Sequence, residues 1–257
     1  MRNGDGSGEA GRALLDAELW RRSEDGHTFG ALVWQAGPGW RMIASSVLGG
    51  GIGPRSFVVN AQVSGDYRRT DPQAHLSGIA AAAGAAGEGV GLLTAADVDR
   101  AQWGADGGVE VLATVGIGRP TWAADSEELD EARLGDEPAD GPLGGQGPGT
   151  INIVVAVPAA LSDAALVNAV ATATEAKVQA VMRAGYACTG TASDAVCVAA
   201  RIAADGLPEE AFGGPRSRWG ARIARAVHAA VYAGALDDAD RLRADGADRG
   251  RAYSARS

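Results

Sequence analysis

Two charged side chains, Glu175 and Lys177, lie two residues apart in one predicted helix. Carboxylate and ammonium groups serve in acid–base chemistry when a fold perturbs their pKa values. The helix should begin at about Ser162, a natural N-cap, and end at about Arg183. Two steps along a helix turn about 200° around its axis, so the two charges cannot pair with each other.

Lys177 lies in the middle of the apolar face of this helix. An unpaired buried ammonium group is costly, so its head must find a partner or reach water. The side chain could snorkel or form a structural ion pair, or its charge could belong to a functional site. The neighbours on this face are apolar: Leu166, Val170, Ala173 and Val181.

Glu175 lies on the opposite, polar face of the same helix. It could be one charge on a solvated surface. The rest of the stripe is uncharged, however, whereas a plain surface would carry several charges, so this face could instead line a site. The other residues of the stripe are Asn168, Thr172 and Gln179.

The elements around this helix predict a single α+β domain with a largely antiparallel sheet and three main helices. The domain should span residues 12–235, with mobile tails at 1–11 and 236–257 and a long acidic loop at 123–147. Helices are predicted at about 72–86, 162–183 and 218–233. Strands are predicted at 27–35, 40–48, 56–63, 89–95, 109–117, 150–157 and 195–200, the first two as a hairpin.

Composition narrows the class of protein. The formal charge of −9 argues against broad contact with nucleic acid or an anionic membrane. No apolar run is long enough to span a bilayer, and no signal-peptide pattern opens the chain. Cys188 and Cys197 lack metal-site spacing and suit a reducing, cytoplasmic compartment. With three histidines in the chain, we expect neither a metal nor another cofactor.

A set of motifs occurs in a fixed order along the chain: Ser45–Gly51, Asn60, Gly91–Ala95, Ala113–Gly116, Pro148–Ile153, Asn168–Val170, Thr174–Lys177 and Gly190–Asp194. Together they resemble the adenosylcobinamide amidohydrolase family, CbiZ, over roughly Trp34 to Val231. Gly213–Ser217 looks like a divergent form of that family's last motif.

The resemblance implies an enzyme that hydrolyses the amide between aminopropanol and the corrin ring, releasing adenosylcobyric acid. Glu175 is then the best candidate for a general base, because burial would raise its pKa toward neutrality. Lys177 could donate a proton or stabilise the oxyanion. Thr191 and Asp194 could act from the turn before the last strand, although they could also only close that turn. The implied substrate contacts are Gly49, Gly50, Gly51, Asn60, Thr114 and Asn152.

A corrinoid-binding protein without hydrolytic activity is the second class to consider. A large ligand needs an apolar cleft with a few polar partners, which the glycine turns could supply. Absence of the Glu175 and Lys177 charges would favour this class, and both charges are present. A corrinoid small molecule is therefore the expected partner in either case.

Overall fold

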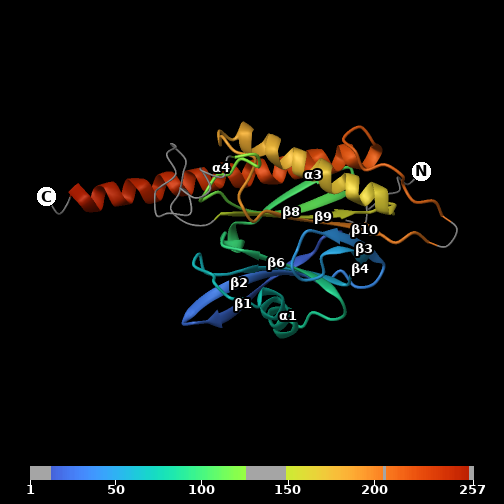
Figure 1. Ribbon diagram of the computed structural model, residues 1–257, viewed down its shortest axis with the longest axis horizontal. Coiled ribbons are helices and arrows are strands. Elements are labelled where there is room, and N and C mark those ends of the chain that lie inside the picture. The colour runs from blue at the N-terminus through green and yellow to red at the C-terminus, as the bar shows by residue number, and fades with distance from the viewer. Residues whose placement is uncertain (1–12, 126–148, 205–206, 255–257) are drawn as a thin grey trace, which may run out of the picture.

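A computed structural model describes residues 13–125, 149–204 and 207–254. In this part of the chain, two β-sheets lie face to face, and helices cover the outer face of each sheet (Figure 1). Three apolar clusters separate these layers, one between the sheets and one under the helices on each side.

The first sheet has the strand order β1-β2-β5-β6. The helix α1, Pro72–Ala82, connects β5 to β6, and these two strands are parallel. The other two pairs in this sheet are antiparallel. The strands are β1 Ala17–Glu24, β2 His27–Trp34, β5 Phe57–Gln62 and β6 Gly89–Thr94.

The second sheet has the strand order β4-β3-β10-β9-β8-β7. The helix α3, Asp163–Arg183, connects β9 to β10, which again form the parallel pair. A short helix, η1 at Val98–Arg100, precedes β7. The strands are β3 Trp40–Ala44, β4 Gly51–Pro54, β7 Gln102–Asp106, β8 Val109–Gly116, β9 Thr150–Val157 and β10 Ala195–Arg201.

Each sheet contains the same succession of elements. A hairpin is followed by an antiparallel third strand, then by a helix that crosses to a parallel fourth strand. The succession is β1-β2-β5-α1-β6 in one sheet and β7-β8-β9-α3-β10 in the other. The hairpin β3-β4 breaks this correspondence, because it comes from the first half of the chain and extends the second sheet beside β10.

Strand β9 shows how the sequence builds two layers at once. Every residue of β9 is buried, and successive side chains point to opposite faces of a strand. Ile151 and Ile153 belong to the apolar cluster under α3, whereas Val154 belongs to the cluster between the sheets. At the start of α3, Ser162 Oγ accepts the N–H of Ala165 at 3.2 Å, as the N-cap prediction requires.

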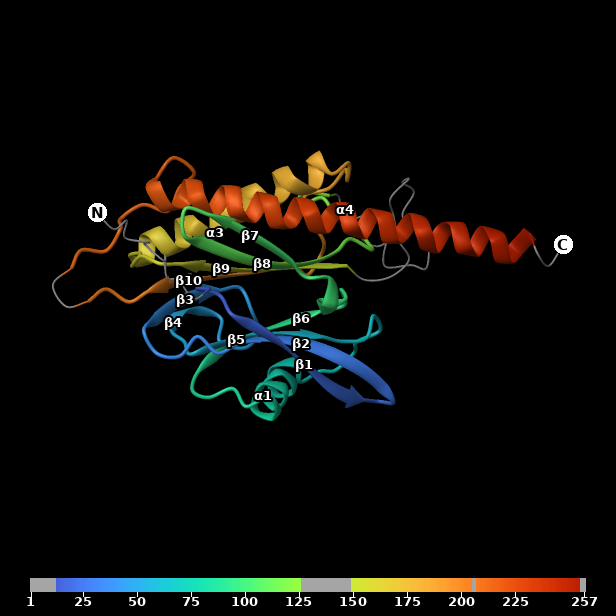
Figure 2. The same ribbon diagram turned by 180° about the vertical axis from the view of Figure 1, so that it is seen from behind.

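The predicted α+β class and its three main helices are confirmed for the described residues, with two mixed sheets instead of one largely antiparallel sheet. The predicted hairpin between the strands at 27–35 and 40–48 is wrong. β2 pairs with β1 and β5, while β3 pairs with β4 and β10. The turn between them carries the chain from one sheet to the other (Figure 2).

The last helix, α4, runs from Arg218 to Ser254, so its predicted end near Ala233 is wrong. The charges after Leu236 suggested a tail, but Asp238 and Ala239 are buried in the described structure. The domain limits of 12–235 stay a prediction. The N-terminal tail at 1–11 and most of the acidic loop, residues 126–147, lie outside the described residues. No described helix is both long and apolar enough to cross a membrane.

Candidate functional site

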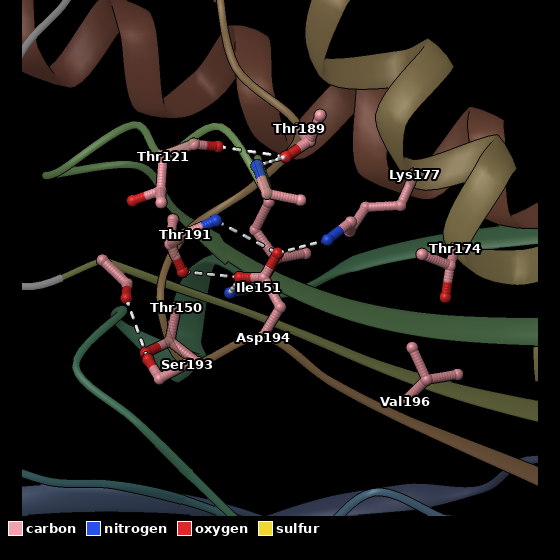
Figure 3. Close-up of polar contacts among 12 residues, drawn as sticks. Thr121, Thr150, Ile151, Thr174, Lys177, Thr189, Thr191, Ser193, Asp194 and Val196 are labelled. Carbon is pink, nitrogen blue, oxygen red and sulfur yellow. Dashed lines mark hydrogen bonds and ion pairs between the residues drawn. The ribbon is translucent and has the colours of Figure 1, made fainter. Parts of the chain in front are cut away.

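Asp194, at the end of the turn before β10, is the centre of a dense hydrogen-bond cluster (Figure 3). Its Oδ1 accepts the N–H of Ile151 at 2.9 Å and the hydroxyl of Thr191 at 2.5 Å. Its Oδ2 accepts the N–H of Thr191 at 3.1 Å and the ammonium group of Lys177. A carboxylate that accepts four hydrogen bonds holds its donors in fixed places, so its geometry suits positioning other groups.

Lys177 approaches this cluster from α3 (Figure 3). Its side chain is 9% exposed, and that of Asp194 is 10% exposed. The apolar face of α3 therefore buries the stem of Lys177 and aims its head at the turn. The structural ion pair that the sequence allowed is present, and the two oxygens of Asp194 hold the Lys177 ammonium group and the Thr191 hydroxyl respectively.

A second group of hydroxyls lies next to the cluster. The hydroxyls of Thr150 and Ser193 are 2.7 Å apart, and Ser193 also donates to the carbonyl of Gly149 at 3.1 Å. Ser193 is exposed, whereas Thr150 is buried. This pair links the turn to the start of β9 and brings a hydroxyl to the surface.

Behind this group, three of the predicted binding residues meet between the sheets. Asn60 Nδ2 donates to Thr114 Oγ1 at 2.9 Å, and Asn152 Nδ2 donates to Asn60 Oδ1 at 2.9 Å. All three are at most 2% exposed. Asn152 Nδ2 also donates to the carbonyl of Leu93 at 2.8 Å, but Asn152 Oδ1 is buried without a partner among the described residues. Such an acceptor needs a donor from water or from a ligand.

The beginning of β9 joins the two clusters. Thr150, Ile151 and Asn152 are consecutive, and they contact Ser193, Asp194 and Asn60 respectively. The sequence predicted both sets of residues but not that one strand connects them. Within three residues, the start of β9 thus contacts the exposed Ser193 and carries the buried amide of Asn152.

The glycine loop, residues 45–50, contacts strands β10 and β6. Ser45 and Val196 exchange two hydrogen bonds, one through the Ser45 hydroxyl, each 3.1 Å long. The N–H of Gly91 donates to the carbonyl of Leu48 at 3.0 Å, so the loop also pairs with β6. It therefore connects the start of β10 with the other sheet.

Two of the predicted glycines are required by backbone packing. A Cβ at Gly49 would overlap the carbonyl of Gly89, and a Cβ at Gly50 would overlap the carbonyl of Ser46. Gly51 has φ +80 and open space around its Cα. A ligand contact by these glycines stays a prediction.

Glu175 is not brought to the cluster. It is exposed on α3, about 200° around the axis from Lys177. Among the described contacts, none joins its carboxylate to Lys177 or Asp194. Burial, on which its selection as a base depended, is absent. A role for Glu175 in catalysis stays a prediction.

The thiols do not offer a nucleophile. Cys188 lies in the chain next to the turn, but burial raises the pKa of its thiol. Burial likewise raises the pKa of Cys197 to about 12. Both groups are therefore thiols at neutral pH, which is the poorly nucleophilic form. No group of three or more His, Cys, Asp or Glu side chains within residues 13–125, 149–204 and 207–254 could hold a metal ion.

Sequence reasoning missed the pairing of Thr150 with Ser193. The available signal was a hydroxyl at the start of a buried strand, where a polar side chain needs a partner. It also missed the importance of Gly190, whose φ is +153. A Cβ at this position would overlap both Asp194 Oδ2 and Lys177 Nζ.

We therefore expect Gly190→Ala to break the ion pair and to lower both the melting temperature and any activity of the site. Gly78→Ala is the matched control, because Gly78 lies in α1 with nothing near its added Cβ. The control should gain about 0.5–1 kcal/mol, since alanine is favoured over glycine inside a helix. Thermal melts of both variants measure these effects. Equal melting temperatures for Gly190→Ala and Gly78→Ala would contradict the expected loss at Gly190.

Comparison with known proteins identifies the family of this chain. The sequence model of the adenosylcobinamide amidohydrolase family, CbiZ, matches residues 16–243. The chain belongs to this family. All of the candidate residues described above lie within the matched range. The ordered motifs that suggested CbiZ from the sequence are thus confirmed as a family relationship.

Two similar proteins are named adenosylcobinamide amidohydrolase. An adenosylcobinamide amidohydrolase of Methanosarcina mazei is 40% identical over 92 residues, which are 34% of this chain and 46% of the relative. One of Halobacterium salinarum is 41% identical over 99 residues, which are 38% of this chain and 40% of the relative. The matched regions thus span less than half of either relative.

A solved structure, that of the PH0078 protein from Pyrococcus horikoshii OT3, matches with a TM-score of 0.42 and 12% identity. The match covers 80% of this chain and 77% of the chain in the solved structure. This similarity is too low to indicate function.

Proposed function

We propose that this protein hydrolyses adenosylcobinamide, cleaving the amide to aminopropanol and releasing adenosylcobyric acid, as a step in cobamide salvage. The observation that carries the proposal is the family match over residues 16–243, which takes in both polar clusters. The names of the two relatives, adenosylcobinamide amidohydrolase, support amide hydrolysis of this substrate class.

The Lys177–Asp194 pair is the proposed electrostatic centre of this reaction. Amide hydrolysis needs a donor for the developing oxyanion and a proton for the leaving amine. The ammonium group of Lys177 meets either need, and Asp194 fixes its position together with that of the Thr191 hydroxyl. The role of Asp194 in this scheme is positioning.

The buried amide of Asn152 is the proposed recognition element. Its Oδ1 lacks a donor among the described residues, and a substrate carboxamide carries an N–H of the right kind. Because Asn152 is 1% exposed, the substrate reaches it only if the layers separate locally near Ser193. The glycine loop borders this entrance and is the proposed backbone contact for the corrinoid.

The proposal is tested by incubating the pure protein with adenosylcobinamide and analysing the products. Formation of adenosylcobyric acid at a rate proportional to protein concentration is the expected result. Binding of the corrinoid without any product would refute hydrolysis and would support the non-catalytic corrinoid-binding class.

The same assay examines Glu175. If Glu175 is a water-activating base, Glu175→Gln should lower turnover about 100-fold, the usual scale for loss of a general base. Its exposure predicts that the free energy of unfolding changes by no more than about 0.5 kcal/mol. Gln179→Ala, on the same polar face, is the control. A fully active Glu175→Gln protein would leave Lys177 as the centre of the proposed chemistry.

A further inference from the structure

A pocket of about 340 Å³ opens between α1 and the glycine loop, outside the polar clusters described above. Phe57 and alanines of α1 provide its apolar lining, and Arg55, Ser77 and Glu88 are its polar side chains. This volume is at the low end of the range for ligand sites. It admits a molecule the size of one substituted ring and is too small for a corrin macrocycle.

Arg55 gives this pocket its charge. Its side chain is only 13% exposed. Nε donates to the carbonyl of Gly49 at 3.2 Å and Nη1 donates to the carbonyl of Pro54 at 2.8 Å, so neutral acceptors fix the guanidinium group. Within the described part of the chain, Nη2 has no hydrogen-bond partner.

The positive charge of Arg55 is poorly neutralised. The nearest carboxylate, that of Glu88, lies 3.5 Å from Nη1, and its side chain is 83% exposed. A largely buried arginine is normally paired closely with an anion. Glu88 instead remains at the rim in water, where it forms at most a weak surface pair.

We propose that this pocket binds a small anion: a carboxylate or phosphate ester on a compact apolar body. The anionic oxygens bind Nη2 of Arg55 and displace Glu88 into solvent, while the body packs on Phe57. A planar guanidinium group suits both oxyanions because it can offer parallel N–H donors. The pocket lies outside the two polar clusters but shares Leu48 and Gly49 with the glycine loop, and anion binding there does not depend on the proposed hydrolysis.

Calorimetric titration with benzoate, phenyl phosphate and the neutral analogue benzamide tests the proposal. Both anions should bind at one site per chain, and benzamide should bind at least about tenfold more weakly, since a hydrogen bond to a charged group has this effect. Equal affinity for benzoate and benzamide would overturn the proposal.

Two variants test whether the anions bind in the pocket beside Arg55. Arg55→Met should weaken anion binding about tenfold or more, whereas Arg21→Met, at an exposed pair with Asp99, should not change it. Ala81→Phe is the second variant, because Ala81 lines the pocket from the exposed side of α1 and its replacement fills the pocket without disturbing the core. Binding of both anions by Ala81→Phe with unchanged affinity would also overturn the proposal.

Discussion

Replacement of Lys177 by Met should lower the free energy of unfolding by about 3 kcal/mol, the lower end of the usual cost of breaking a buried ion pair. Met keeps the length of the stem but removes the ammonium group. Asp194 then remains almost buried with a negative charge and only its bonds from Ile151 and Thr191. Those remaining donors are the reason to expect the lower end of the range. Urea denaturation measures the loss.

A double-mutant cycle separates the charge pair from simple packing. Asp194→Asn alone leaves Lys177 buried without its partner, so it should also be destabilising. The double variant leaves neither charge uncompensated and should be more stable than the sum of the two single losses. Strict additivity would mean that the pair makes no energetic contribution. Lys177→Met that folds and hydrolyses adenosylcobinamide at the original rate would remove Lys177 from the proposed chemistry.

Asp238→Ala should cost about 2–4 kcal/mol of stability, because it removes the acceptor of buried donors. Asp238 Oδ2 accepts the N–H of Ile117 at 3.1 Å and the hydroxyl of Tyr186 at 2.9 Å, and its side chain is 2% exposed. Burial and the charge of Asp238 both raise the pKa of Tyr186, so the phenol remains a donor. Thermal and urea unfolding measure the effect.

Asp240→Ala is the matched control for Asp238. It lies two residues further along α4, its side chain is 76% exposed, and it pairs with Arg243 at the surface. Loss of such a pair should change stability by no more than about 0.5 kcal/mol. Similar losses for the two variants would mean that α4 is not fastened to the body through Asp238.

Local features of this fold could be predicted from the sequence. The N-cap of Ser162 and the period of the apolar residues predict α3, and continuous apolar runs predict β8 and β9. These signals are local because they arise from hydrogen bonds and faces within one element. The same periodicity correctly placed Lys177 on the buried face of α3.

Partners distant in the sequence could not be predicted in this way. Periodicity states that Lys177 needs an acceptor but does not identify Asp194. The contact between Asn60 and Asn152 spans 92 positions, and no local pattern specifies it. The charged residues after Leu236 suggested a solvated tail. The donors that bind Asp238 come from distant parts of the chain, so its burial is visible only in the folded structure. Glu175 was selected on an expected burial that its place on α3 does not provide.

The position of the β3-β4 hairpin determines the order in which the chain can assemble. The described strands of the first sheet all lie before residue 95, so they are made before the strands β7 to β10 of the second sheet. The hairpin is made in the same period, but its neighbour β10 begins only at Ala195, and the Ser45–Val196 bond spans 151 positions. Closing so long a loop is entropically costly and slow. During synthesis, β3 thus has an unpaired edge until β10 emerges, and the second sheet is completed last.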